Sequence, residues 1–259
     1  MKLPYYEVSA FTTNPFDGNP AGVCPLDAWL PDTVLQKIAA NNNLAETAFT
    51  VPRGDDFELR WFTPTVEVDL CGHATLAAAF VLFNERGLGG DELRFHTRSG
   101  LLTVTRDKEM LTLDFPSRPA APCAVPDALI RGLGATPKKV FKSRDYLAVF
   151  TNEAEVRALK PDFAVLKTLD CLGIIATAPG TDCDSVSRFF APSAGVDEDP
   201  VTGSAHCTLI PYWAERSGKT KLSARQVSQR GGELSCDLRG NRVLISGKAI
   251  VYLRGSIET

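Results

Sequence analysis

The chain has 259 residues, a formal net charge of -3 and 44% hydrophobic residues. This balance gives no electrostatic reason to expect nucleic acid or an anionic membrane as a partner. The longest apolar run, Leu76 to Phe83, is far too short to span a bilayer. The 7 cysteines form no CxxC pair, and the N-terminus lacks the apolar core of a signal peptide. We therefore expect reduced thiols in a cytoplasmic protein.

The first part of the chain predicts strands around one buried helix. A strand over 4–11 is followed by the turn-rich stretch TTNPFDGNPAG, which could bring backbone close to a ligand but is typical of ordinary turns. A helix is expected from Pro31 to the NNN run, and the helix over 73–86 is apolar nearly all round, so it should be central. The remaining expected strands are 48–51, 58–62, 92–97, 101–106 and 110–115.

The proline-rich segment 117–126 is typical of a linker, and the elements after it repeat the first order. Helices are expected at 127–133, 161–169 and 204–216, and strands at 145–151, 172–177, 185–190, 226–229, 233–238, 242–246 and 248–253. Each half is then mostly antiparallel strands around one buried helix, an α+β arrangement. We expect the halves to be 1–116 plus 249–259 and 117–248, with the tail returning to the first half.

An internal repeat supports this division. Residues 60–87 and 188–218 both open with Arg-aromatic-Phe-x-Pro, pass a Val-Asp pair and reach a glycine, Gly72 or Gly203. Each glycine precedes an expected helix that ends at a second glycine, Gly87 or Gly218. A repeat of this length indicates two related halves, and such an arrangement usually places a site between them.

Both repeats place a glycine at the start of a helix, where the first amides have no partner inside the helix and the helix dipole is positive. Gly72 and Gly203, with Ser204 after it, are therefore candidates for holding a carboxylate or stabilising an enolate-like charge. Many structural helices begin in the same way. The recurrence at equivalent places in both halves favours the functional interpretation.

Glu46 is the candidate acid/base. It lies among the apolar residues of NNNLAETAFT, where desolvation would raise the pKa of its carboxyl toward neutral pH. The alternative is a capping box, with Asn43 as N-cap and Glu46 at the third helical position. The AFTV segment favours a strand over that helix, but the residues leave both interpretations open.

Five further residues near the two glycines could carry chemistry. Asp199 could act as a second acid/base or orienter, or cap the helix. His73 follows Gly72, where the helix start disfavours the imidazolium form, and Cys71 precedes it, where the same field lowers a thiol pKa. A metal site with His206 and Cys207 is disfavoured, because neighbours on a helix point about 100° apart. No dinucleotide or phosphate-loop motif is present.

Taken together, NPFDGNPAGV, NNLAETAF, RWFTPTVEVDLCGHATLAAA and DEDPVTGSAH resemble the PhzF-like (phenazine biosynthesis-like) family, in the family's order and over essentially the whole chain. The resemblance implies the diaminopimelate epimerase fold: two pseudo-symmetric halves, each a curved sheet wrapping a central helix, with the site in the cleft between. It also implies an isomerase that uses no metal, nucleotide or flavin cofactor.

The best understood member of that family moves a proton along a dihydro-hydroxyanthranilate. Its catalytic glutamate matches Glu46, and its accompanying histidine, aspartate and serine match His73, Asp199 and Ser204. The glycine amides of the family's site match Gly72 and Gly203. The resemblance thus implies that Glu46, His73 and Asp199 are catalytic, that the other three bind substrate, and that the protein is a homodimer.

The sequence departs from the related epimerases at the second glycine. Those enzymes use two cysteines, one beside each helix start, whereas here Cys71 has no counterpart until Cys207 inside the second helix. We therefore expect a cofactor-independent isomerase that uses Glu46 on a small carboxylate-bearing metabolite. A Cys71-dependent epimerase and a non-catalytic metabolite-binding protein are the alternatives.

Overall fold

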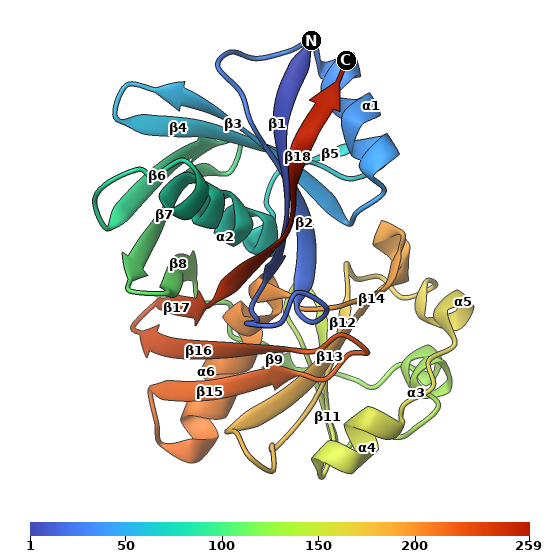
Figure 1. Cartoon of the computed structure of the whole chain (residues 1–259). Helices are drawn as coiled ribbons and strands as arrows, with labels where there is room; N and C mark the ends of the chain where they lie inside the picture. Colours follow the sequence, from blue (N-terminus) through green and yellow to red (C-terminus); the bar gives the residue numbers. More distant parts are fainter. The chain divides into compact units, whose positions relative to one another are not determined.

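A computed structural model describes residues 1–259, and the contacts within it divide the chain into two compact units (Figure 1). Unit 1 comprises residues 1–114 and 246–259, and unit 2 comprises residues 115–245. The halves expected from the sequence differ from these units by two residues at the first boundary (116 against 114) and by three at the second (249 against 246).

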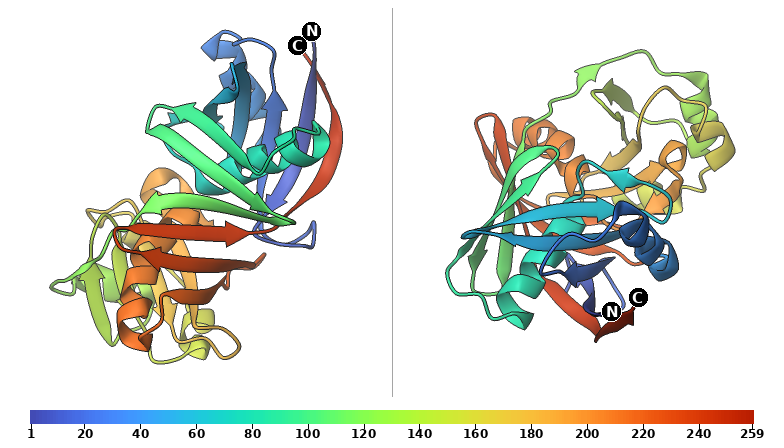
Figure 2. Two further views of the ribbon diagram at one scale, coloured as in Figure 1. Left: turned by 90° about the vertical axis from the view of Figure 1, so that its left-hand side faces the viewer. Right: turned by 90° about the horizontal axis from the view of Figure 1, so that it is seen from above.

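Unit 1 is built on strands that are mostly antiparallel. β1 and β18 pair over their whole length, from Lys2 opposite Glu258 to Ala10 opposite Ala249. The two termini of the chain therefore lie side by side, as Figure 2 shows in both of its views. The strands are β1 (Lys2–Ala10), β2 (Asn19–Pro25), β3 (Glu46–Arg53), β4 (Asp56–Phe62), β5 (Glu67–Val68), β6 (Glu92–Thr97), β7 (Gly100–Asp107), β8 (Met110–Pro116) and β18 (Ala249–Glu258).

The expected central helix of unit 1 is α2 (Gly72–Phe80), and every residue from Gly72 to Ala79 is buried. Its run of alanines lets the helix lie close to β1, β2 and β3, against which it packs. The helix continues as a π-helical turn over Val81–Glu85. The surface helix α1 (Asp32–Asn42) buries Leu35, Ile38 and Ala39 on one face, as its periodicity predicts.

Unit 2 repeats the arrangement around α6 (His206–Ser217), which is entered through a short 3₁₀ turn, η3 (Gly203–Ala205). Its strands are β9 (Ala121–Pro122), β10 (Lys139–Lys142), β11 (Tyr146–Val149), β12 (Ile174–Ala178), β13 (Ser185–Ala191), β14 (Val196–Asp199), β15 (Lys221–Gln226), β16 (Gly232–Arg239) and β17 (Arg242–Gly247). Its other helices are α3 (Asp127–Leu133), α4 (Glu153–Ala158), α5 (Phe163–Leu166) and the 3₁₀ turn η2 (Pro192–Ala194).

The strand directions of the two units match. In unit 1, β2 runs parallel to β3, β3 antiparallel to β4, β4 parallel to β6 and β6 antiparallel to β7. In unit 2 the same order of directions links β11, β12, β13, β15 and β16. The expected α+β fold of two similar, mostly antiparallel halves, each with a central helix, is confirmed.

Some expectations were wrong in detail. The strand expected over 226–229 lies earlier, as β15, because the turn residues around Gly231 begin directly after Gln226. The linker segment contains β9, which pairs with β10. The helix expected over 161–169 is reduced to the single turn α5. The turn-rich stretch 12–22 ends in a strand, β2, which begins at Asn19. The sequence did not predict this strand, because its prolines and glycine are typical of turns.

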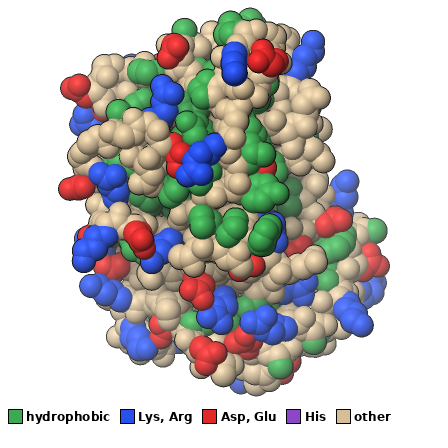
Figure 3. All heavy atoms as spheres, in the orientation of Figure 1, with side chains coloured by type: hydrophobic (Ala, Val, Ile, Leu, Met, Phe, Trp, Pro, Cys, Tyr) green, Lys and Arg blue, Asp and Glu red, His purple; other side chains and the backbone are tan.

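Three large apolar side chains are exposed on unit 1 near its last strand: Phe16, Tyr252 and Leu253. The Phe16 and Tyr252 rings meet edge to face, with centroids 6.2 Å apart. Figure 3 shows hydrophobic side chains gathered over β1 and β18. No helix of the structure has the length and apolar character needed to cross a bilayer.

Candidate active site

Glu46 is the first residue of β3, where it lies opposite Ala21 of the parallel strand β2. The preceding helix α1 ends at Asn43, which adopts a left-handed conformation with φ of 51°. Glu46 therefore does not sit in the first turn of a helix, and the capping-box alternative is wrong. The Glu46 side chain is 17% exposed, so its carboxylate is largely shielded while one part still reaches solvent.

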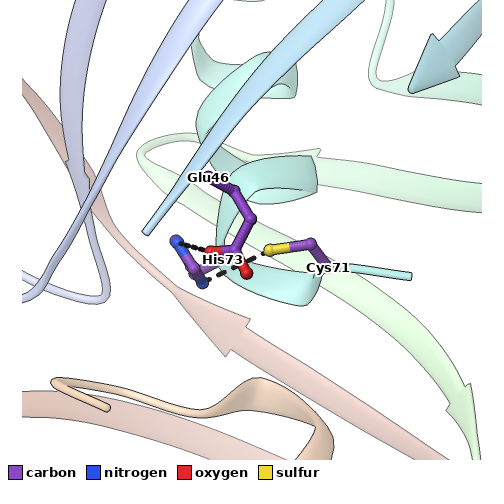
Figure 4. Close-up of side chains that lie close together, drawn as sticks. All are labelled: Glu46, Cys71 and His73. Carbon is purple, nitrogen blue, oxygen red and sulfur yellow. Dashed lines mark hydrogen bonds and ion pairs between the residues drawn. The ribbon is translucent and has the colours of Figure 1, made fainter. Parts of the chain in front are cut away.

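His73 is the second residue of α2 and lies beside Glu46. Its Nε2 is 3.3 Å from the Oε2 atom of Glu46, and its side chain is 6% exposed (Figure 4). Burial lowers the pKa of His73 to about 3. The positive end of the helix acts in the same direction. His73 is therefore a neutral imidazole at physiological pH, as its place at the helix start predicts.

The other ring nitrogen of His73 has two neighbours. The Nδ2 atom of Asn19 lies 3.1 Å from Nδ1, and the Sγ atom of Cys71 lies 3.5 Å from it. In Figure 4 the contacts of His73 with Glu46 and with Cys71 reach different ring nitrogens. The structure thus brings together Glu46, His73 and Cys71, and it adds Asn19, which is fully buried at the start of β2.

These side chains also include a possible metal ligand set, because atoms of Glu46, Cys71 and His73 lie within 4.8 Å of one another. An ion needs one lone pair from each ligand, directed at a common point. Here Glu46 faces Nε2 and Cys71 faces Nδ1, so the imidazole presents opposite edges to its two neighbours. The arrangement fits a chain of polar contacts through the imidazole better than a shared ion, and the absence of a metal stays a prediction.

Gly72, the first residue of α2, offers a helix start without a local cap. Its N-cap residue, Cys71, is extended and makes no side-chain bond to the first helical amides. The carbonyl oxygen of Cys71 instead accepts a hydrogen bond from the Thr75 hydroxyl, which ties the segment to the helix. The first turn is therefore held in place while its side-chain cap is missing, which is compatible with the expected anion-binding role.

In unit 2, Asp199 is the last residue of β14 and is fixed by its neighbours. The Thr202 hydroxyl donates to its carboxylate. Gln226 completes the connection, since its Nε2 donates to the Asp199 carbonyl oxygen at 2.6 Å and its Oε1 accepts from the Thr202 amide at 2.9 Å. Asp199 is thus held rigidly before Gly203, in a position to orient another group.

Ser204, within η3, has a cationic neighbour that the sequence did not indicate. The Nη2 atom of Arg144 lies 3.4 Å from the Ser204 hydroxyl and 3.4 Å from the Asp145 carboxylate. Asp145 is 2% exposed, and burial raises the pKa of its carboxyl although Arg144 opposes the shift. Because 60 residues separate Arg144 from Ser204 and no motif surrounds it, only the fold could reveal the pair.

Cys207 is poorly suited to act as a second catalytic thiol. Its side chain is buried inside α6, and burial raises the pKa of the thiol to about 11. A thiol of that pKa is almost wholly protonated at neutral pH and is a poor base or nucleophile. Cys207 lies in the first turn of α6, four residues after Gly203, so it does not occupy the place that Cys71 holds directly before Gly72.

Comparison with known proteins gives one family over nearly the whole chain. The family described as "Phenazine biosynthesis-like protein" (PhzC-PhzF) matches residues 8–255. An uncharacterized isomerase of Pseudomonas aeruginosa is 56% identical over 258 residues, which cover 100% of both chains. The crystal structure of a PhzF family phenazine biosynthesis protein of Enterococcus faecalis is 47% identical, with a TM-score of 0.98 and 100% of both chains covered.

A more distant likeness concerns the fold alone. The structure of a hydroxyproline epimerase from Agrobacterium vitis superposes with a TM-score of 0.63 at 10% identity, over 99% of this chain and 92% of that one. The expected fold is thereby confirmed, and the expectation of an isomerase agrees with the names of the close relatives. From the match over residues 8–255 and the identity of its relatives, the chain belongs to the PhzC-PhzF phenazine biosynthesis-like family.

Proposed function

We propose that this protein is a cofactor-independent isomerase that moves a proton between two carbons of a small carboxylate-bearing metabolite, with Glu46 as the acid/base. The name isomerase carried by the 56% identical relative supports the reaction class. The observation that carries the proposal is the pair formed by Glu46 and the neutral His73, whose facing atoms are 3.3 Å apart in a largely buried setting.

The proposed reaction needs no oxidant or reductant. Glu46 takes a proton from one carbon as the C–H bond breaks, and the bonding electrons shift within the substrate. The same carboxyl then returns the proton to another carbon, where a new C–H bond forms. His73 orients Glu46, and the first amides of α2, beginning at Gly72, would stabilise negative charge that develops on the substrate.

The residues of unit 2 support a carboxylate on the substrate. Gly203 and Ser204 begin the path into α6, and the Arg144 guanidinium lies 3.4 Å from the Ser204 hydroxyl. An arginine and a hydroxyl are suitable donors for a carboxylate. Asp199, fixed by Thr202 and Gln226, would accept a hydrogen bond from a substrate amine or hydroxyl.

The thiol-dependent alternative is favoured by the position of Cys71 beside His73, at 3.5 Å. A reactive thiolate, however, needs a positive neighbour or a competent base. His73, whose pKa burial lowers to about 3, is neither at neutral pH. A non-catalytic binding protein would keep the same residues, so only the presence or absence of proton exchange separates it from the enzyme.

Proton NMR in deuterated water tests the proposal. Wild-type protein and Glu46→Gln are incubated with a panel of small amino- and hydroxy-carboxylates, including dihydro-hydroxyanthranilate. Deuterium that enters a carbon position with wild type and not with Glu46→Gln supports the proposed chemistry. Exchange that persists in Glu46→Gln and stops in Cys71→Ala would replace it with the thiol mechanism. Binding of a compound, seen by line broadening, without exchange at any carbon would favour the binding protein.

The homodimer stays a prediction. The exposed side chains of Phe16, Tyr252 and Leu253 in unit 1 are where a second copy would bury apolar area. Light scattering on wild type and Tyr252→Glu tests this directly. A dimer that Tyr252→Glu dissociates places the interface at this patch, and a wild-type monomer at micromolar concentration contradicts the prediction.

A further inference from the structure

Asn19 and Glu46 lie on the same face of the sheet in unit 1. Ala21 of β2 is in register with Glu46 of the parallel strand β3, and Asn19 precedes Ala21 by two residues. Since side chains alternate along a strand, Asn19 and Ala21 point to the same side as Glu46. The helix α2 packs against β2 and β3, which brings His73 between the two polar side chains.

The chain before Asn19 fixes its position closely. Gly18 has a φ of 69°, and a Cβ atom added there would lie 2.3 Å from the Ala10 carbonyl oxygen. Only glycine fits this close approach. The side chain of Asn14 closes the same loop, because its Oδ1 accepts from the Phe16 amide. Asn19 then enters the β1–β2 pairing opposite Ala10 and is completely buried.

The contact of Asn19 with His73 determines which ring nitrogen carries the proton. The Asn19 Nδ2 atom, 3.1 Å from Nδ1, is a donor only. Nδ1 must therefore be the unprotonated, accepting nitrogen. Because burial lowers the pKa of His73 to about 3, the ring is neutral and its single N–H proton resides on Nε2. Nε2 is the atom that faces Glu46 at 3.3 Å.

The tautomer has consequences for both neighbours of His73. An N–H on Nε2 is directed toward the carboxylate of Glu46, the group that accepts a proton from carbon in the proposed reaction. The lone pair of Nδ1 is directed toward Asn19 and Cys71, so no ring proton is available on that side. The neutral ring therefore supports Glu46 as the base and provides no positive charge to stabilise a Cys71 thiolate.

We propose that Asn19 is a positioning residue that fixes His73 as the Nε2–H tautomer, so that the imidazole donates toward Glu46. Asn19 acts through His73 and is not itself assigned a contact with substrate. The tautomer rests on the contact of Asn19 with Nδ1 and on the burial of the ring, and not on any reaction. Its consequence for turnover rests on the proposed function, and the experiment below separates the two.

The chain contains its own reference for the test. It has only 3 histidines, His73, His96 and His206. The Nδ1 atom of the buried His206 lies 2.9 Å from the Thr202 carbonyl oxygen, which can only accept, so His206 must be the Nδ1–H tautomer. Burial lowers the pKa of His206 to about 4, so this ring is neutral as well. Two neutral histidines of opposite tautomer are thus expected in one spectrum.

The measurement is a long-range nitrogen–proton NMR correlation on protein labelled with ¹⁵N-histidine at pH 7, without substrate. Substitution of His96 and His206 assigns the signals. In the wild type we expect His73 to show a protonated Nε2 and His206 a protonated Nδ1. Wild-type protein in which His73 carries its proton on Nδ1 would overturn the proposal, whatever the reaction proves to be.

Asn19→Asp sharpens the test, because a carboxylate at this position only accepts and should move the proton of His73 to Nδ1. Asn41→Asp, at an exposed asparagine of α1 whose amide donates to the Lys37 carbonyl oxygen, is the matched control and should leave all signals unchanged. The His206 signals report whether Asn19→Asp keeps its fold, and Asn19→Ala provides a second variant without the new charge. An unchanged His73 tautomer in folded Asn19→Asp would contradict the assignment.

Activity provides the separate readout. Once an exchanging compound is known, Asn19→Asp should slow deuterium exchange by about 100-fold, since the wrong tautomer of a catalytic histidine is known to cost about that or more in other enzymes. A shifted tautomer with full exchange would leave Asn19 as the determinant of the tautomer but remove its role in turnover. No exchange in the wild type would count against the proposed function while the tautomer result stands.

Discussion

The two central helices begin with similar sequences, but the histidine near each helix start has different contacts. α2 begins at Gly72, α6 is entered through a 3₁₀ turn that begins at Gly203, and both helices hold a buried, neutral histidine in their first turn. His206 contacts the Thr202 carbonyl oxygen, a backbone atom four residues away, whereas His73 contacts the side chains of Asn19 and Glu46 from two strands. The contact of His206 stabilises a helix start. The contacts of His73 form the candidate proton-transfer site.

The polar groups around the two starts differ in the same sense. At α2 they form a chain from Asn19 through His73 to Glu46, with a single ionisable carboxylate at its end. Near the start of α6, Thr202 and Gln226 donate hydrogen bonds to Asp199. Arg144 makes a separate contact with Ser204. On the proposed function, the start of α2 carries the proton transfer, and Arg144 and Ser204 near the start of α6 are donors suited to an anionic group.

The largest expected effect is on the proton carrier. Glu46→Gln keeps the shape and polarity of the side chain but cannot accept a proton, so we expect proton exchange to fall about 1,000-fold with binding retained. Glu67→Gln, a carboxylate in the same unit that pairs with Arg60, is the control and should keep most activity. Full proton exchange in Glu46→Gln would contradict the assignment of proton transfer to the site at the start of α2.

The second prediction concerns acid sensitivity. The pKa of each buried histidine is lowered on folding from 6.5, to about 3 for His73 and about 4 for His206. Between pH 6.5 and 4 the unfolded chain therefore binds more protons than the folded protein. The stability from these rings is fully present above pH 6.5 and is lost as the pH falls. At pH 5 we expect a loss of about 2 kcal/mol per histidine.

Urea unfolding at several pH values between 4 and 7 measures this loss. His206→Asn should reduce the dependence of the unfolding free energy on pH by the contribution of one histidine. The variant should still fold, because the Nδ2 atom of the asparagine can donate to the Thr202 carbonyl oxygen. His96→Gln, which removes the partly exposed histidine that contacts Asp56, controls for the remaining ring. A slope in His206→Asn equal to that of the wild type would mean that His206 is not a buried neutral group.

A smaller effect is expected at the second helix start. Ser204→Ala and Arg144→Gln should each raise the KM about 10-fold and leave kcat nearly unchanged, since each removes one hydrogen bond to a charged group. Arg225→Gln, which breaks an exposed ion pair with Glu233 in the same unit, is the control. A fall in kcat without a change in KM would place these residues in the chemical step instead.

The smallest effect is expected for Cys71. Cys71→Ser keeps a polar hydrogen next to the Nδ1 atom of His73, and we expect exchange within about 3-fold of the wild type. Cys123→Ser, in unit 2, controls for the loss of a thiol elsewhere. A loss of more than about 100-fold in Cys71→Ser would support the thiol mechanism, because a catalytic nucleophile or base typically contributes at least that much.

The sequence predicted much of the fold because its signals are local. The apolar stretch 73–86 predicted a buried helix, and the period of Leu35, Ile38 and Ala39 predicted α1. Strand β2 was missed because its prolines and glycines are typical of turns. Its place is fixed by pairing with β1 and β3, which are interactions between residues distant along the chain.

The candidate site shows the same limit. Glu46 and His73 stood out by their type and their neighbours, and the structure places them together. Asn19 lies within the turn-rich segment TTNPFDGNPAG, but the sequence of a turn does not predict that its asparagine contacts His73 in the interior. Arg144 and Asp145 belong to no motif, and their relation to Ser204 depends on the fold of unit 2.

The central claim is that a single carboxylate, Glu46, carries the proton. The most direct test uses an exchanging substrate with deuterium at the donor carbon, turned over once in ordinary water with the enzyme in excess. We expect part of the deuterium to appear on the acceptor carbon of the product, because one carboxyl carries it from one carbon to the other. Complete loss of the label, together with loss of turnover in Cys71→Ser, would contradict the account.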